Sequence, residues 1–177
     1  MEKRHGLSIF LVLTTVMIIS SGNVEAGRES AQVTINATVE ENSCTIDFDS
    51  GIQTISLNDI SEGGLKKGTV SGEKSFSIKL NDCGYTSLVS VATTGVPDQD
   101  DNTAFANQST GGATGVGVYV YTSDGIKFMP DGSNAAIIPL RLGDTKTIDF
   151  KVAYVATNEI VYGGPFRTTF GMIINYH

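Results

Sequence analysis

Alternation of apolar and polar residues with a period of two constrains the fold of this chain more than any other feature. In Glu73–Leu80, Phe76, Ile78 and Leu80 fall on one face and Ser, Ser and Lys on the other. Such alternation is typical of half-buried β-strands, and helical spacing is nearly absent. The same reading predicts further strands at Leu88–Thr93, Val116–Tyr121, Thr147–Ala156 and Phe166–Tyr176.

Turn signals separate these segments at short intervals. Ser123-Asp124-Gly125 predicts a hairpin turn that leads into Ile126–Met129. The stretch Pro97–Gly115 is a long polar connection that could hold a short helical turn near Thr103–Ala106. Several short strands with regular turns predict an all-β sandwich, which we favour over a barrel.

The N-terminus has the layout of a signal peptide. Lys3 and Arg4 precede the apolar run Leu7–Ile19, and the small-residue pattern Val24-Glu25-Ala26 follows. The alternative is a membrane anchor, but the apolar run is short of the roughly 20 residues that a spanning helix needs. We therefore expect residues 1–26 to be removed and the mature, exported chain to begin at Gly27.

Charge and cysteines narrow the class of protein further. A net charge of −7 argues against nucleic acid and anionic membranes as partners. Cys44 and Cys83 are the only cysteines, and an even count in an exported chain predicts one disulfide, with two buried thiols as the alternative. No histidine lies near them, so they do not indicate a metal site.

Catalytic residues are scarce. The only histidines are His5, in the signal segment, and the terminal His177, so no Ser-His-Asp or Cys-His arrangement fits inside the domain. Distant carboxylates could still meet in space, which leaves a secreted hydrolase as a formal alternative. The sequence predicts a protein that is not an enzyme and that has no cofactor.

Three further motifs in the sequence are weaker. Asp98, Asp100 and Asp101 form an acidic cluster, but the glycine and glutamate of a calcium-binding EF-hand loop are missing, so a solvated loop is expected. The glycines of GGATGVG precede a strand and not a helix, unlike a dinucleotide-binding turn. Asn36 and Asn107 fit the N-glycosylation pattern, which is common by chance.

Strands at the two ends of the mature chain carry the functional hypothesis. Phe166–Tyr176 ends the chain with no tail to cover its edge, and an open edge beside apolar pockets favours strand addition. Ala31–Val39 has no hairpin partner nearby, so it must pair far away in sequence or with another molecule. Its apolar face consists of Val33, Ile35, Ala37 and Val39.

The order of several motifs resembles the pilins of chaperone–usher fimbriae, most closely type 1 fimbrial subunits. They are VTINATV before SCTI at Cys44, FSIKLNDC ending at Cys83, GVGVYVYTSDG, FKVAYVAT and the ending FGMIINYH with its penultimate Tyr176. The resemblance covers the whole mature chain. One departure is Ala37, where the family usually has glycine, so a groove that accepts this strand must also accommodate a methyl group.

The resemblance implies an incomplete immunoglobulin-like sandwich that lacks its last strand. It divides the chain into a signal peptide (1–26), a donor-strand extension (27–43) and a pilin domain (44–177). A periplasmic chaperone would fill the groove first, and the extension of the next subunit would replace it at the outer-membrane usher and form a cell-surface fimbria. The implied groove and chaperone contacts are Phe166, Phe170, Met172, Ile174, Tyr176 and His177.

Two other outcomes stay open at this point. A tip-associated adhesin or carbohydrate-binding module is the alternative function, although the chain is short for two domains and has no tryptophan. In an isolated subunit the strand Ala31–Val39 could also lie in the protein's own groove, and this arrangement would be compatible with exchange between subunits.

Overall fold

Two five-stranded sheets make up the part of the chain that the structure describes, and no helix is present there. The computed structural model describes residues 31–36, 44–47, 52–61, 63, 65–84 and 88–177. Their strands are β1 (Ala31–Asn36), β2 (Thr45–Ile46), β3 (Ile52–Leu57), β4 (Val70–Asn81), β5 (Leu88–Gly95), β6 (Phe105–Ala106), β7 (Val116–Thr122), β8 (Ala135–Pro139), β9 (Lys146–Ala156) and β10 (Arg167–Tyr176).

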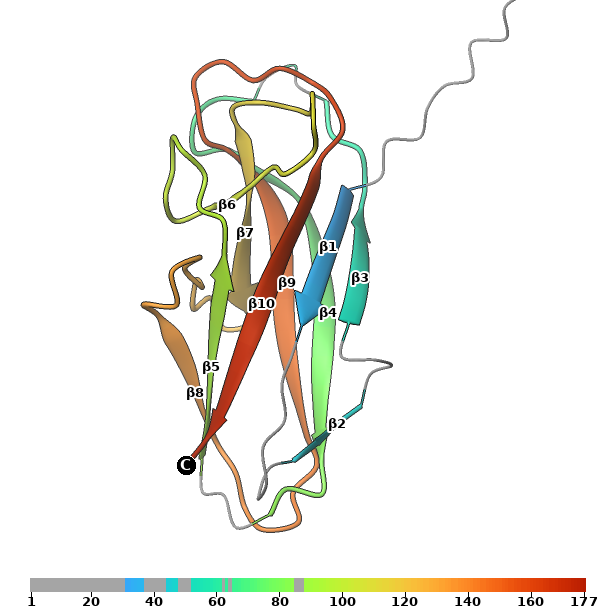
Figure 1. The fold of residues 1–177 in the computed structure, drawn as a ribbon, viewed down its shortest axis with the longest axis vertical. Helices are drawn as coiled ribbons and strands as arrows, with labels where there is room; N and C mark the ends of the chain where they lie inside the picture. Colours follow the sequence, from blue (N-terminus) through green and yellow to red (C-terminus); the bar gives the residue numbers. More distant parts are fainter. Residues whose placement is uncertain (1–30, 37–43, 48–51, 62, 64, 85–87) are drawn as a thin grey trace, which may run out of the picture.

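The sheets pack face to face with the core between them (Figure 1). One sheet has the strand order β3-β1-β10-β5-β8, and the other has the order β2-β4-β9-β7-β6. Alternate residues of each strand point into the core, as in other sandwiches. The all-β sandwich predicted from the sequence is therefore confirmed. Within the residues described, no helix is long and apolar enough to cross a membrane.

The predicted alternation is realised most clearly between β4 and β9. Phe76 pairs with Phe150 and Ile78 with Ile148 in an antiparallel register, and all four side chains are buried. The two phenylalanine rings stack with centroids 5.2 Å apart. A shift of one residue would turn this entire face outward, so core burial fixes the register.

The predicted hairpin turn after β7 is also confirmed. The Thr122 amide donates to the Ile126 carbonyl oxygen at 3.0 Å, and the Gly125 amide donates to Thr122 at 3.0 Å. Gly125 has a φ of +93°, a conformation that glycine adopts without steric strain. Only an isolated bridge between Tyr121 and Lys127 follows the turn, not a named strand.

The short helical turn considered near Thr103–Ala106 is absent. Phe105 and Ala106 form β6 instead, which pairs with β7. Phe105 is fully buried, and its ring centroid lies 4.9 Å from that of Phe170 on β10. Tertiary packing of this aromatic pair outweighs any local helical preference. The edge strands β3 and β8 were also not predicted, because their short segments carry weak alternation.

The predicted disulfide joins Cys44, just before β2, to Cys83, just after β4. Both cysteines are 1% exposed, and their Cα atoms are 3.9 Å apart. No free cysteine remains among the residues that the structure covers. The bridge therefore holds the beginning of the sandwich against the end of β4.

Alkaline pH is expected to destabilise the fold through Tyr154 on β9. Burial raises the pKa of Tyr154 to about 12, with the nearby Asp59 carboxylate as the second cause, whereas an unfolded tyrosine titrates near 10. The native state therefore holds this proton more tightly than the unfolded state. Its contribution is complete below about pH 10 and is lost as the pH rises through about 12, a decrease of roughly 2 kcal/mol.

Urea unfolding at intervals from pH 9 to 12 measures this decrease. The matched control is Tyr154→Phe, which keeps the ring that packs edge-to-face on Phe166 at 5.4 Å but cannot ionise. The control should show a shallower loss of unfolding free energy over this range. Parallel curves for the two proteins would contradict the assignment to Tyr154.

Candidate functional site

The candidate site is the groove between β3 and β10, which β1 fills in this structure. β1 pairs with β3 on one side and with β10 on the other, and it is the strand that joins them in the sheet (Figure 1). Removing β1 would leave unpaired backbone groups on both neighbours. An edge of this kind favours the addition of an extended segment.

Two rows of side chains show how β1 fills the groove. Val33 lies between Thr168 of β10 and Ile55 of β3, and Ile35 lies in the next row on the same face of β1. Both Val33 and Ile35 have no exposed surface. Two residues of the predicted donor face, Val33 and Ile35, therefore occupy the groove of their own chain. The other two, Ala37 and Val39, lie outside the described residues.

The residues predicted as groove and chaperone contacts lie along β10 and at its two ends. Phe166, which directly precedes β10, is buried, as are Phe170, Met172 and Ile174, whereas Tyr176 is half-buried. Sequence reasoning missed Thr168, which has the same inward parity and no exposed surface, and it missed the contribution of β3 altogether. Thr168 could have been predicted from the sequence, because it falls between Phe166 and Phe170 in the same every-second-residue series of Phe166–Tyr176.

The direction of β1 is unusual. It runs parallel to β10, whereas every other strand pairing among the described residues is antiparallel (Figure 1). A short segment connects Asn36 to Cys44, and the disulfide fixes Cys44 near β2. The parallel direction brings Asn36 toward this end of the sandwich. A strand from another molecule would not have this constraint.

The energy of strand insertion is finely balanced. Burying a valine or isoleucine side chain gains about 1.5–3 kcal/mol, and ordering each backbone residue costs about 1–2 kcal/mol. The buried side chains of β1 therefore do not offset the ordering of the strand by themselves. Ladder hydrogen bonds to β3 and β10 are the additional stabilising term, so occupancy of the groove depends on the whole strand.

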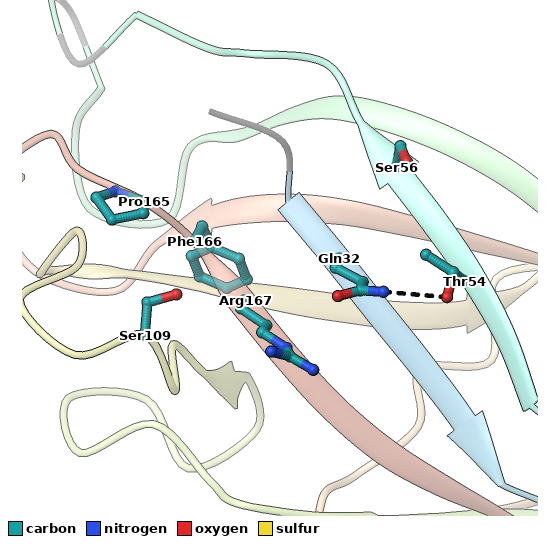
Figure 2. Close-up of a pocket in the computed structure, with 7 residues that line it drawn as sticks. All are labelled: Gln32, Thr54, Ser56, Ser109, Pro165, Phe166 and Arg167. Atoms are coloured by element: carbon teal, nitrogen blue, oxygen red, sulfur yellow. Dashed lines mark hydrogen bonds between the residues drawn. The ribbon is translucent and has the colours of Figure 1, made fainter. Parts of the chain in front are cut away.

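A pocket of about 340 Å³ lies beside the N-terminal end of β1, where β10 begins (Figure 2). Among its lining residues, the side-chain amide of Gln32 donates to the Thr54 hydroxyl at 3.2 Å. This contact ties β1 to β3 on the outer face of the sheet. The lining residues are Gln32, Thr54, Ser56, Ser109, Pro165, Phe166 and Arg167.

The C-terminus is held at the opposite end of β10. The His177 amide donates to the Leu88 carbonyl oxygen at 3.0 Å, and the Leu88 amide donates to the His177 carbonyl oxygen at 3.3 Å. The Ser90 hydroxyl lies 3.1 Å from His177 Nε2. The last residue of the chain is thus fixed in the sheet beside the groove wall.

The acidic stretch near Asp98 acts as a hydrogen-bonded loop. Asp98 Oδ1 accepts the amides of Asp100 and Asp101, while Asp101 accepts hydrogen bonds from Tyr119 and Thr103. Burial alone would raise the pKa of Asp101, but these hydrogen bonds outweigh it and hold the pKa below its usual value. No cluster of metal-binding side chains occurs in the described part of the chain.

Asn107, one of the possible glycosylation positions, is used structurally. Its amide nitrogen donates to the carbonyl oxygens of Ala113 and Pro165, both at 2.9 Å. Its amide oxygen accepts from the Ser109 and Arg167 backbone amides. A glycan at this nitrogen would disrupt the network that positions the start of β10.

Comparisons with known proteins agree with this architecture. Residues 31–177 match the family described as "Fimbrial protein". Long polar fimbria protein A of Salmonella typhimurium is 29% identical over 160 residues, covering 88% of this chain and 89% of that protein. The probable major fimbrial subunit LpfA of Escherichia coli O157:H7 is 30% identical over 156 residues, covering 85% and 86%.

A solved structure of a chaperone–usher pilus has the same fold. Its similarity to this chain has a TM-score of 0.66 at 21% identity and covers 80% of this chain and 92% of that one. The family match spans all of the described residues, and within them β1 completes the sheet between β3 and β10. The chain belongs to the fimbrial protein family and is a structural subunit of a cell-surface fimbria.

Proposed function

We propose that the subunit polymerises with its N-terminal segment as donor strand and the groove between β3 and β10 as acceptor. The supporting observation is that β1 completes this sheet with two fully buried aliphatic side chains although it lies outside the sandwich sequence that follows Cys44. The proposed donor residues are Val33, Ile35, Ala37 and Val39.

The same groove would receive a periplasmic chaperone before assembly. The proposed contacts lie on one face of β10 and at the chain end, where backbone hydrogen bonds to Leu88 fix the terminal residue. The outer-membrane usher would then exchange the chaperone for the next subunit. The proposed chaperone contacts are Phe166, Phe170, Met172, Ile174, Tyr176 and His177.

This role divides the chain into a removed signal (1–26), a donor extension (27–43) and a pilin domain (44–177), and it requires no enzymatic activity. In the isolated subunit, β1 would occupy its own groove until a chaperone or a neighbouring subunit displaces it. The parallel direction of β1, which brings Asn36 toward Cys44 of the same chain, is compatible with such a temporary occupant.

Electron microscopy of surface fibres tests the structural role. Fibres from cells that express the chain with a small surface epitope tag should be labelled along the shaft by antibody-coated gold. Label confined to fibre tips would favour the alternative function, a tip-associated adhesin. Fibres without label, from cells that export the tagged chain, would contradict incorporation.

A further inference from the structure

Two of the buried polar atoms that have no hydrogen-bond partner belong to residues paired with β1. They are the hydroxyl oxygen of Thr168 on β10 and the side-chain carbonyl oxygen of Gln53 on β3, each unpaired within the described part of the chain. Buried polar atoms are nearly always paired in native proteins, so each such exception calls for an explanation. Thr168 has no exposed surface at all, and solvent therefore does not satisfy it.

Both atoms lie in the rows that β1 occupies. Thr168 is the β10 neighbour of Val33, and Gln53 is the β3 neighbour of Ile35. Each inward side chain described on β1 is thus aliphatic and lies next to one polar residue of the groove. The groove has a polar position in each of two successive rows, whereas its present occupant has none.

The segment Ala31–Val39 of this chain cannot supply the missing hydrogen-bond partners from its inward side chains, in whatever register it pairs. The inward face of Ala31–Val39 is apolar at every second position, whichever way the strand runs. Turning the strand over would present Gln32, Thr34 and Asn36 but would place Val33 and Ile35 in solvent. A second copy of this chain has the same limitation as β1 itself.

We propose that Thr168 and Gln53 determine which donor strand the groove accepts, and that the favoured occupant is the strand of a different subunit. That strand would carry a serine or threonine among its inward residues, so that its hydroxyl pairs with Thr168 or donates to Gln53. This inference rests on the proposed donor–acceptor function. It places the subunit at a junction with an unlike neighbour.

Synthetic peptides test the inference without knowledge of the register. The native peptide comprises residues 27–43, and four variants each introduce one hydroxyl on the inward face: Val33→Thr, Ile35→Thr, Ala37→Ser and Val39→Thr. Each fluorescent peptide is incubated with the mature chain, and its incorporation and release are followed by anisotropy. Valine and threonine have nearly the same shape, so these two variants report the hydroxyl itself.

At least one hydroxyl peptide is expected to bind about tenfold more tightly than the native peptide, the effect of one satisfied hydrogen bond. This gain in affinity should disappear in the groove variant that removes the partner of the hydroxyl. That variant is Thr168→Val if the hydroxyl lies beside Thr168 and Gln53→Leu if it lies beside Gln53. The gain should persist in Thr169→Val, a matched control at the neighbouring, partly exposed position of β10.

The outcomes separate the two hypotheses. If the native peptide is incorporated and every hydroxyl peptide binds more weakly to the unmodified chain, the inference is overturned while the donor–acceptor function stands, and no groove variant needs to fold for this result. If no peptide is incorporated under any condition, the proposed function fails and the inference fails with it.

Discussion

Replacing Ile35 with aspartate is expected to abolish donation of the N-terminal strand. Ile35 has no exposed surface in the groove, and its row neighbours are Phe170 and Gln53, neither of which carries a positive charge to neutralise a carboxylate. An unpaired buried charge costs about 3–5 kcal/mol, which corresponds to more than about a hundredfold loss of groove occupancy. Fibres should therefore lack the variant as a donor.

The matched control is Thr34→Asp, one residue earlier on the outward, partly exposed face of the same strand. This variant introduces the same charge and should still be incorporated. Both chains keep the groove itself, so a chaperone should co-purify with each of them from the periplasm. Fibre incorporation is measured by immunogold labelling, and normal incorporation of Ile35→Asp would exclude Val33–Val39 as the donor segment.

Removing the disulfide is expected to cost about 4 kcal/mol of unfolding free energy. The bridge closes a loop with a sequence separation of 39, and the chain-entropy relation gives this magnitude for such a loop. A domain of ordinary stability has about 5–15 kcal/mol in total, so the loss is a large share of it. The bridge also fixes Cys44, which follows the proposed donor segment in the sequence.

Urea unfolding of the mature chain, of Cys44→Ala/Cys83→Ala and of both proteins under reducing conditions measures this contribution. Reduction should lower the midpoint of the unmodified chain toward that of the double variant and should leave the double variant unchanged. Equal midpoints for the oxidised chain and the double variant would show that the bridge contributes nothing to equilibrium stability.

The proposed function requires a stable sandwich combined with a replaceable strand. The pairing between β4 and β9 and the aromatic core are internal to the pilin domain, whereas β1 contributes only a short strand with two buried aliphatic side chains. Low local stability of this kind is expected of elements that exchange partners. Replacement of β1 would therefore leave the rest of the fold intact.

The long strands could be predicted because the alternation of apolar and polar residues is visible within each segment of the sequence. β4, β7, β9 and β10 each place a series of mostly apolar residues on one face, and burying that face is what stabilises such a strand. β6 was not predictable, since Phe105 is extended only because its ring packs on Phe170 from a distant strand. β3 and β8 lie at the edges of a sheet, where a short segment becomes a strand because it pairs with a neighbouring strand.

The sequence by itself determined the all-β class, the single disulfide and an N-terminal strand without a local partner, because periodicity and cysteine count are properties of the chain. Only the tertiary structure decided that β3 forms the second wall of the groove and that β1 runs parallel to β10. It also decided that Thr168 and Gln53 are buried without partners. These facts depend on which strands meet across the sheet, and such neighbours are set by long-range packing that no local pattern encodes.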